Sequence, residues 1–534
     1  MSDNEILSPE QQDEGATALV SEEGSPLQIF GKLSRLSWET AASYSFSMQM
    51  GMLVYLLSQL NDDEEHLAAI TLITSLLNSL VGIGVSPLLA TALVAGKELG
   101  ELREAQKNGE SDELLQLKRE HLAAAFGNAL ILSMVTSPVI IAIMVNAKPL
   151  LVHGMNQDEA VAEIASSFIK YYSLAIPAIM VRISADNILF AFEKTRPAMI
   201  LSLINLSLGM SLGSVLAFGK LGAPKMGATG LLVGCILDPW LTAAEYLIYL
   251  AVTPEFKSFP FLQWNKPWHP YWGQLKEMTT YGGSIAANMT VETTLNLVIN
   301  LYAGIVGVRQ QAAFSSIMQF SLFSFLLQIA FGQTAAQEIN RKIGASQFEL
   351  ASLAGKMGIA SLMAYILPVL ITFSVYPQVL SLSASQNGQS LNQILQSLAP
   401  IMFAGCAFDA LRFTLLQQLR VLGDDQRATA ISMGSIVIGI VLSGVLGLKT
   451  ELNINGVAAG FTFSTGLAAC MLLLRWISRI QASSIEKNKA EGIDSVSVAR
   501  LSFFSSVTIN SRAGSEQDVE LGVTNPIHSV ELAR

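Results

Sequence analysis

The chain has 534 residues, of which 51% are hydrophobic and only 14% are charged, and its mean hydropathy is +0.45. A soluble domain carries roughly a quarter charged residues, so this composition argues against a soluble enzyme. The formal net charge of −10 and the pI of about 5.2 argue against the basic surface of a nucleic-acid-binding protein. We therefore expect neither catalysis nor a nucleic-acid partner.

The first 28 residues are acidic and polar. They hold seven Asp and Glu residues and no Lys or Arg, which is typical of a solvated tail without a packed core. No basic stretch followed by an apolar one stands here, so we expect no cleavable signal peptide. The first membrane span would then act as the insertion signal.

Apolar runs of about 20 residues follow, separated by short charged breaks. At 1.5 Å per residue such runs cross the roughly 30 Å hydrocarbon core of a bilayer as helices. They are too long for strands and show no alternation of period two. The fold class is therefore all-α and polytopic, with twelve spans at about 40–60, 67–95, 123–146, 164–190, 198–219, 228–252, 282–306, 312–335, 353–376, 394–418, 428–447 and 455–478.

Orientation follows from the basic residues of the short loops. About sixteen Lys and Arg fall on one set of loops, including 97–121, and about five on the other set. Cytoplasmic loops carry the excess of basic residues, so both termini are predicted to be cytoplasmic. We expect a location in the plasma membrane, the inner membrane of a bacterium.

The two halves of the chain resemble each other at several loop motifs. Lys97-Glu-Leu-Gly100 corresponds to Arg341-Lys-Ile-Gly344, and Phe192-Glu-Lys-Thr corresponds to Leu422-Gly-Asp-Asp. Each half would hold six spans, so the halves enter the membrane from the same side and a pseudo-two-fold axis runs along its normal. The predicted domains are a disordered cytoplasmic tail (1–28), an N-terminal lobe (29–252), a cytoplasmic linker (253–280), a C-terminal lobe (281–480) and a polar cytoplasmic tail (481–534).

Glu292 is the leading candidate for an ion- or substrate-binding residue. A charge at the centre of a spanning helix costs about 2.5–3.5 kcal/mol on insertion scales, so its presence needs a reason. Asn288 and Asn296, four residues before and after it, share its helical face. Such a carboxyl could carry a proton, bind Na⁺ or bind a cationic substrate. The alternative is a protonated Glu that bonds a neighbouring helix.

Other charges lie within the predicted spans. Asp409 stands three residues before Arg412, a spacing at which the two can pair. Arg182 and Asp186 form a similar pair at i and i+4, for which a structural role is favoured. Asp238, followed by Pro239, is a second-tier candidate because a broken helix would free carbonyl groups, although a simple kink explains it as well.

No cofactor site is legible. The chain has no Gly-rich loop followed by Lys and Ser or Thr, its five His residues are scattered through loops and tails, and its three Cys residues fall in apolar runs. We therefore expect no bound cofactor or metal centre, with H⁺ or Na⁺ as the coupling ion.

Across about residues 30–480 the sequence resembles the multidrug and toxic compound extrusion (MATE) transporters, in particular their NorM-type branch. In the seventh span Gly282 and Glu292 keep that branch's spacing of ten residues, with Gly-Ser in place of Leu-Pro. In the tenth span Asp409 and Leu419-Arg420 follow the family pattern. The chain departs from it in the N-terminal lobe, where Gly209 stands in place of an Asp.

The resemblance implies a secondary antiporter that exports amphipathic or cationic small molecules, with ion coupling at Glu292 and Asp409. Within transport, the alternative is a flippase for lipid-linked oligosaccharides, which a basic cavity with Arg182 and Arg412 would favour. A membrane scaffold or receptor that does not transport is the alternative from another class. In each case we expect a monomer surrounded by membrane lipid.

Overall fold

The computed structural model describes residues 25–44, 49, 52–53, 56–57, 64–154, 159–257, 259–261, 271–377 and 388–490. The chain divides into two units, Met1–Ser483 and Ser484–Arg534, and the contacts below lie within the first. The first predicted span, about 40–60, falls largely outside the described residues.

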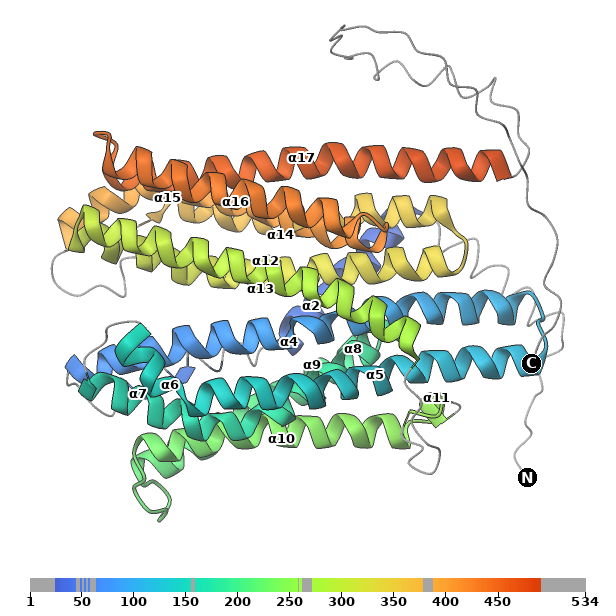
Figure 1. The fold of residues 1–534 in the computed structure, drawn as a ribbon, viewed down its shortest axis with the longest axis horizontal. Helices are drawn as coiled ribbons and strands as arrows, with labels where there is room; N and C mark the ends of the chain where they lie inside the picture. The colour runs from blue at the N-terminus through green and yellow to red at the C-terminus, as the bar shows by residue number, and fades with distance from the viewer. Residues whose placement is uncertain are drawn as a thin grey trace, which may run out of the picture. The chain divides into compact units, whose positions relative to one another are not determined.

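Helices make up nearly all of the described structure (Figure 1). The helices of the N-terminal half are α2 (Pro26–Ser43), α4 (Glu64–Lys107), α5 (Asp112–Val145), α6 (Ala147–Pro149), α7 (Glu159–Tyr172), α8 (Ile176–Ala191), α9 (Thr195–Phe218), α10 (Ala228–Val252) and α11 (Pro254–Lys257). A short π-helix η1 (Leu150–Gly154) precedes α7, and a short 3₁₀ helix η2 (Ser173–Ala175) joins α7 to α8. The second half holds α12 (Trp272–Val306), α13 (Val308–Gly344), α14 (Phe348–Val375), α15 (Gly388–Val421), α16 (Asp425–Leu448) and α17 (Asn453–Ala490).

Ten of the described helical segments are long and apolar enough to cross a membrane. They correspond to all the predicted spans except the first and the eighth. The eighth corresponds to α13, whose buried face carries the polar side chains of Gln328, Gln333, Gln337 and Asn340. Polar groups bury in a membrane mainly when they pair within the protein, and two of those on α13, Gln333 and Asn340, pair with the other lobe, as shown below.

Local sequence sets several helix ends. Pro26 stands in the first turn of α2, where its missing N–H costs nothing, and Ser25 accepts a hydrogen bond from the Gln28 amide at 3.3 Å. Ser111 caps α5 in the same way, and Asp112 and Glu113 complement the dipole of its first turn. The helices extend well past their apolar runs, so α4 continues to Lys107 and leaves only a short turn before Ser111.

Each half has its own hydrophobic core. One buried cluster joins helices α4 to α10, with Phe126, Ile179 and Tyr246 among its members. A second joins α12 to α17, with Phe314 and Phe403 among its members. We refer to these halves as the N-terminal and C-terminal lobes.

The two lobes are related by a pseudo-two-fold axis, and they meet where this axis passes between α4 and α13. A Cβ atom on Gly100 would lie 2.3 Å from the carbonyl oxygen of Arg341, and one on Gly344 would lie 2.3 Å from that of Lys97. These four residues are two positions of one motif, repeated 244 residues apart. The sequence repeat is therefore also a repeat of contacts, and only glycine permits this approach of the two backbones.

The lobes also share polar contacts along α13. The Tyr44 hydroxyl donates to Oε1 of Gln333, whose Nε2 donates to Oδ1 of Asn187 on α8 at 2.8 Å. Nearer the end of the helix, Nδ2 of Asn340 donates to the Leu93 carbonyl at 2.6 Å. Gln333 and Asn340 of the polar face of α13 are thus hydrogen-bonded to the N-terminal lobe.

Candidate functional site

Four side chains form a closed ring of hydrogen bonds inside the C-terminal lobe. Arg412 of α15 donates from Nη1 to Oγ of Ser432 on α16, at 2.7 Å, and Ser432 donates to Oδ1 of Asn288 on α12, at 2.8 Å. Nδ2 of Asn288 donates to Oε2 of Glu292, at 3.3 Å, and the same oxygen accepts from Nη2 of Arg412, at 3.1 Å. The ring ties three helices together around one carboxylate.

Asp409 joins the ring through Arg412. Its Oδ1 lies 2.8 Å from Nε and 2.7 Å from Nη2 of that guanidinium group, so the i, i+3 pair predicted from the sequence is present. The Arg412 side chain is 1% exposed, whereas those of Glu292 and Asp409 are 12% and 14% exposed. Two acids therefore share one guanidinium, and the cluster carries one negative charge when both are ionised.

The structure does not bring Asn296 into this ring. It lies one helical turn beyond Glu292 on α12 and is only half-buried. Asn288, at the same spacing on the other side, is 1% exposed and does belong to the ring. Both Asn residues were predicted candidates because they share the Glu292 face, but the spacing alone does not distinguish the buried neighbour from the other one.

Asp238, the remaining candidate, lies in the N-terminal lobe. Its Oδ2 is 3.7 Å from Nη1 of Arg182, and both side chains are at most 1% exposed. Arg182 also donates to Oγ of Ser202 on α9, at 2.9 Å, and to the Ser43 carbonyl, at 3.2 Å. Asp238 is thus part of a second buried cluster centred on an arginine, distant in sequence from the first.

The two arginines occupy equivalent positions of the repeat. Arg182 and Arg412 are 230 residues apart, and each bonds the serine that follows it by 20 residues, Ser202 in one lobe and Ser432 in the other. The sequence comparison paired Phe192 with Leu422, at the same offset. Extending that alignment ten residues backwards would have revealed the pair.

α10 is continuous through Asp238 and Pro239, so the helix is not broken there. Proline cannot donate to the carbonyl four residues earlier, that of Cys235, and Nε2 of Gln49 lies 3.5 Å from this oxygen. The Thr242 hydroxyl donates to the Asp238 carbonyl at 2.9 Å. Side chains therefore satisfy the carbonyls around the proline.

The ring connects to a second polar group nearer the α15–α16 turn. Ser284 lies one turn before Asn288 and donates to Oδ1 of Asp425 at 2.6 Å, and Nε of Arg420 lies 3.1 Å from the same oxygen. In the N-terminal lobe Thr195, which stands 230 residues before Asp425 and so at its position in the repeat, donates its hydroxyl to the Glu39 carboxylate on α2. This position is therefore the donor in one lobe and the acceptor in the other.

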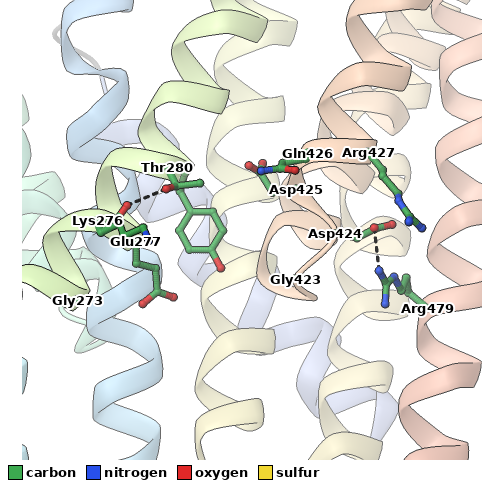
Figure 2. Close-up of a pocket in the computed structure, with 11 residues that line it drawn as sticks. Gly273, Lys276, Glu277, Thr280, Gly423, Asp424, Asp425, Gln426, Arg427 and Arg479 are labelled. Atoms are coloured by element: carbon green, nitrogen blue, oxygen red, sulfur yellow. Dashed lines mark hydrogen bonds and ion pairs between the residues drawn. The ribbon is translucent and has the colours of Figure 1, made fainter.

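A cleft of about 500 Å³ opens beside Asp425, between α12 and the α15–α16 turn (Figure 2). Lys276 and Glu277 stand on its α12 side, and on the other side Asp424 is turned toward Arg479 of α17. Hydrogen bonds from Arg475 and Arg479, which outweigh the opposing effect of partial burial, lower the pKa of Asp424 to about 2. Asp424 therefore stays ionised and attaches the turn to α17.

The end of the lobes that carries the turns 108–111, 192–194, 345–347 and 422–424 is rich in Lys and Arg, and we call it the basic end. Five charged residues connect the two lobes there, and we call them the basic-end network. Glu193 is paired with Arg341, with Lys32 at 3.2 Å and with Arg103 at 3.8 Å. Glu338, beside Arg341 on α13, also binds Lys32, at 3.3 Å. The network joins α2, α4 and the α8–α9 turn of one lobe to α13 of the other.

The charge balance of this network favours its ionised form. Burial alone would raise the pKa of Glu193, but Arg341, Lys32 and Arg103 outweigh that effect and lower it to about 2. In the sequence, Glu193 stands out only as part of a repeat motif. A more specific signal was the presence of a single acid in a turn that faces several bases.

These features define the class of protein: a multi-pass helical membrane protein built from two repeated lobes, with buried charged clusters in each lobe and charged contacts between them. The MatE family model matches residues 115–215 and 284–445. The chain belongs to this family, as a divergent NorM-like member.

Relatives and solved structures agree with this assignment. The multidrug resistance protein NorM of Vibrio vulnificus (strain YJ016) is 24% identical over 380 residues, which cover 70% of this chain and 82% of the relative. The crystal structure of the eukaryotic MATE transporter AtDTX14 matches 86% of this chain and 98% of its own, with a TM-score of 0.72 at 17% identity. A multidrug resistance MATE family transporter in an outward-facing conformation matches 86% of this chain and 97% of its own, with a TM-score of 0.74 at 16% identity. The predicted fold, two six-helix bundles in a twelve-helix transporter, is confirmed at the level of these structures.

Proposed function

We propose that this protein is a secondary active antiporter that exports amphipathic or cationic small molecules in exchange for H⁺ or Na⁺ by alternating access. The observation that carries the proposal is the ring around Glu292, which holds a carboxylate inside the membrane-spanning part of the C-terminal lobe. Intramembrane ionisable residues of this kind mark ion and substrate pathways. The names of the relatives, multidrug resistance proteins, support the substrate class.

The proposed mechanism is competition for one carboxylate. The coupling ion and the substrate cannot occupy the site at Glu292 and Asp409 at the same time. Binding of one therefore displaces the other as the lobes rock. The basic-end network closes one end of the interface between the lobes, and a state open at that end must break it. We place the basic end in the cytoplasm of a bacterial cell, with the chain acting as a monomer in the inner membrane.

A flippase for lipid-linked oligosaccharides fits these contacts less well. Such a ligand would need basic side chains free to bind its phosphates, whereas Arg182 and Arg412 each face a carboxylate at 3.7 Å or less. Their positive charges are compensated inside each lobe.

The test is transport of a fluorescent organic cation in proteoliposomes under an imposed H⁺ or Na⁺ gradient. We expect gradient-driven transport by the wild type and at least a roughly tenfold loss in Glu292→Gln, because the neutral amide cannot exchange an ion for the substrate. Glu451→Gln, an exposed acid in the α16–α17 turn, is the matched control and should transport normally.

Three results would contradict parts of this proposal. Unchanged transport by a folded Glu292→Gln variant would remove this carboxylate from coupling and direct attention to Asp238. Transport in the absence of any gradient would contradict antiport. Failure of the wild type to move any of a panel of organic cations under either gradient would leave the flippase and the scaffold as the better readings.

A further inference from the structure

Four oxygen atoms of the cluster around Glu292 that a metal cation could use already accept hydrogen bonds. Oε2 of Glu292 accepts from Arg412 and from Asn288, and Oδ1 of Asp409 accepts twice from Arg412. Oδ1 of Asn288 accepts from Ser432, and Oγ of Ser432 accepts from Arg412. A Na⁺ ion needs several bare oxygen atoms directed toward it, and N–H and O–H donors already bond these four.

Half of the negative charge that a cation would neutralise is also compensated, because the guanidinium of Arg412 stands between the two acids. The charged groups that act on Glu292 are Arg412, Asp409 and Arg420, all on α15, whereas α16 and α12 contribute the uncharged Ser432 and Asn288. A guanidinium group does not lose its proton in proteins, so Arg412 is a permanent positive charge 3.1 Å from Glu292. A second cation at this carboxylate would be repelled at close range in a medium of low dielectric constant.

The N-terminal lobe has a similar arrangement, in which the carboxylate comes from α10. Arg182 holds the equivalent serine and faces Asp238 at 3.7 Å, so a buried guanidinium again stands beside an intramembrane carboxylate. The pairing is therefore a feature of both halves of the repeat.

We infer that Arg412 is a resident cation of the C-terminal site, which therefore exchanges protons at Glu292 and does not bind Na⁺. This inference rests on the proposed antiport and specifies its ion. A proton needs no empty coordination shell, because it binds one oxygen of Glu292 and leaves the cluster neutral. Arg412 then keeps its bonds to Asp409 and Ser432 and loses only the attraction of Glu292.

Removing the guanidinium group should create a Na⁺ site. In Arg412→Gln the two acids lose their common counter-charge, and the amide oxygen adds a ligand. The measurement is the thermal unfolding midpoint of the purified full-length protein, with Na⁺ or choline at equal ionic strength and neutral pH. We expect no difference for the wild type and a rise of about 2 °C or more with Na⁺ for Arg412→Gln, since a ligand that binds only the folded state raises its stability.

Two variants serve as controls. Arg412→Lys keeps the positive charge and should respond to Na⁺ no more than the wild type does. Arg182→Gln removes the equivalent guanidinium group of the other lobe and leaves the ring around Glu292 intact. Binding of ²²Na⁺ by the Arg412→Gln protein should therefore not depend on Arg182. The same binding should disappear in the double variant Arg412→Gln/Glu292→Gln.

The inference is overturned if Na⁺ raises the unfolding midpoint of the wild type and Glu292→Gln abolishes this rise. This measurement can be made even if the arginine variants do not fold. A folded Arg412→Gln protein that gains no Na⁺ response would also overturn it. Wild-type transport driven by a Na⁺ gradient alone would reject the inference while the proposed antiport stands. If no coupled transport is found, the proposed antiport is rejected. The effect of Na⁺ on the unfolding midpoint then still tests the role of Arg412.

Discussion

The buried arginines show how single residues hold each lobe together. Arg182 and Arg412 are among the largest fully buried side chains of the described residues, and each is held by one serine hydroxyl from the next helix. A hydrogen bond to a charged group contributes about 1.5–3 kcal/mol, more than a neutral one, because the buried charge has no water to replace its partner. These two serines should therefore matter more than other hydroxyls of the same helices.

We predict that Ser202→Ala and Ser432→Ala each lower the stability by about 1.5–3 kcal/mol, seen as a lower unfolding midpoint in detergent. Ser207→Ala is the control, because Ser207 is exposed and its hydroxyl donates to the Leu203 carbonyl of its own helix. A decrease in the control as large as that in the other two variants would contradict the special role of the arginine-bound serines.

At this scale the sequence predicted local relations and missed distant ones. The Asp409–Arg412 pair followed from a spacing of three residues on one helix. The bond from Arg412 to Glu292 joins positions 120 residues apart, and that between Ser432 and Asn288 joins positions 144 residues apart. Such contacts depend on how three helices pack, which apolar runs do not encode. Ser432 was missed because serine is common in membrane helices and nothing local distinguishes this one.

The helices themselves followed closely from the apolar runs. Where the residues are described, every predicted span lies within helical structure, but the ends differ because a helix continues beyond the bilayer wherever its backbone remains bonded. The 97–121 segment lies between two predicted spans, and the alternating acids and bases of 103–121 indicate a solvated helix. The structure forms the segment from the end of α4 and the start of α5, with a short turn at 108–111. Hydropathy marks the apolar part of a helix and is silent about its solvated ends.

Helix packing between the lobes depends on glycine at Gly100 and Gly344. We predict that Gly344→Ala forces α4 and α13 apart at the basic end, because its Cβ atom would lie 2.3 Å from a backbone oxygen that cannot move alone. Spin labels at Lys107→Cys and Gln347→Cys, with the exposed Cys470 replaced by Ser, should report a longer distance by electron spin resonance.

Gly127→Ala provides the matched control for this substitution. A Cβ atom on Gly127, in the interior of α5, would meet nothing within 4 Å, so the label distance should not change. An unchanged distance in a folded Gly344→Ala protein would contradict the prediction, and Gly100→Ala should give the same result as Gly344→Ala by symmetry.

For the whole molecule, the basic-end network links the two lobes through charges that depend on pH. The pKa of Glu193 is lowered from 4.5 to about 2 by its three basic partners, after they overcome the cost of burial. A lowered pKa means that the contact contributes fully above the unperturbed value and is lost as the pH falls through the lowered one. Closure of the basic end should therefore be insensitive to pH near neutrality and weaken below about pH 4.5.

We predict that Glu193→Gln shifts the protein toward a state open at the basic end at neutral pH, because Arg341, Lys32 and Arg103 then lose a shared counter-ion. The same pair of spin labels measures the shift, and the wild type should approach the variant as the pH falls from about 5 to about 3. Glu113→Gln, an exposed acid in the first turn of α5, is the control. An equal population of open protein in Glu193→Gln and the wild type at neutral pH would show that the network does not hold the lobes.

The repeated contact around Gly100 and Gly344 has a consequence for the origin of the chain. Because each half presents the same motif to the other, the contact is isologous, as in a symmetric homodimer. A single six-helix half could have formed a homodimer with a second copy of itself through this surface. Each substitution there would then have changed the interface at two symmetric positions. In one chain the two halves are free of that constraint, and Thr195 where the other half has Asp425 is the kind of divergence that independent halves accumulate.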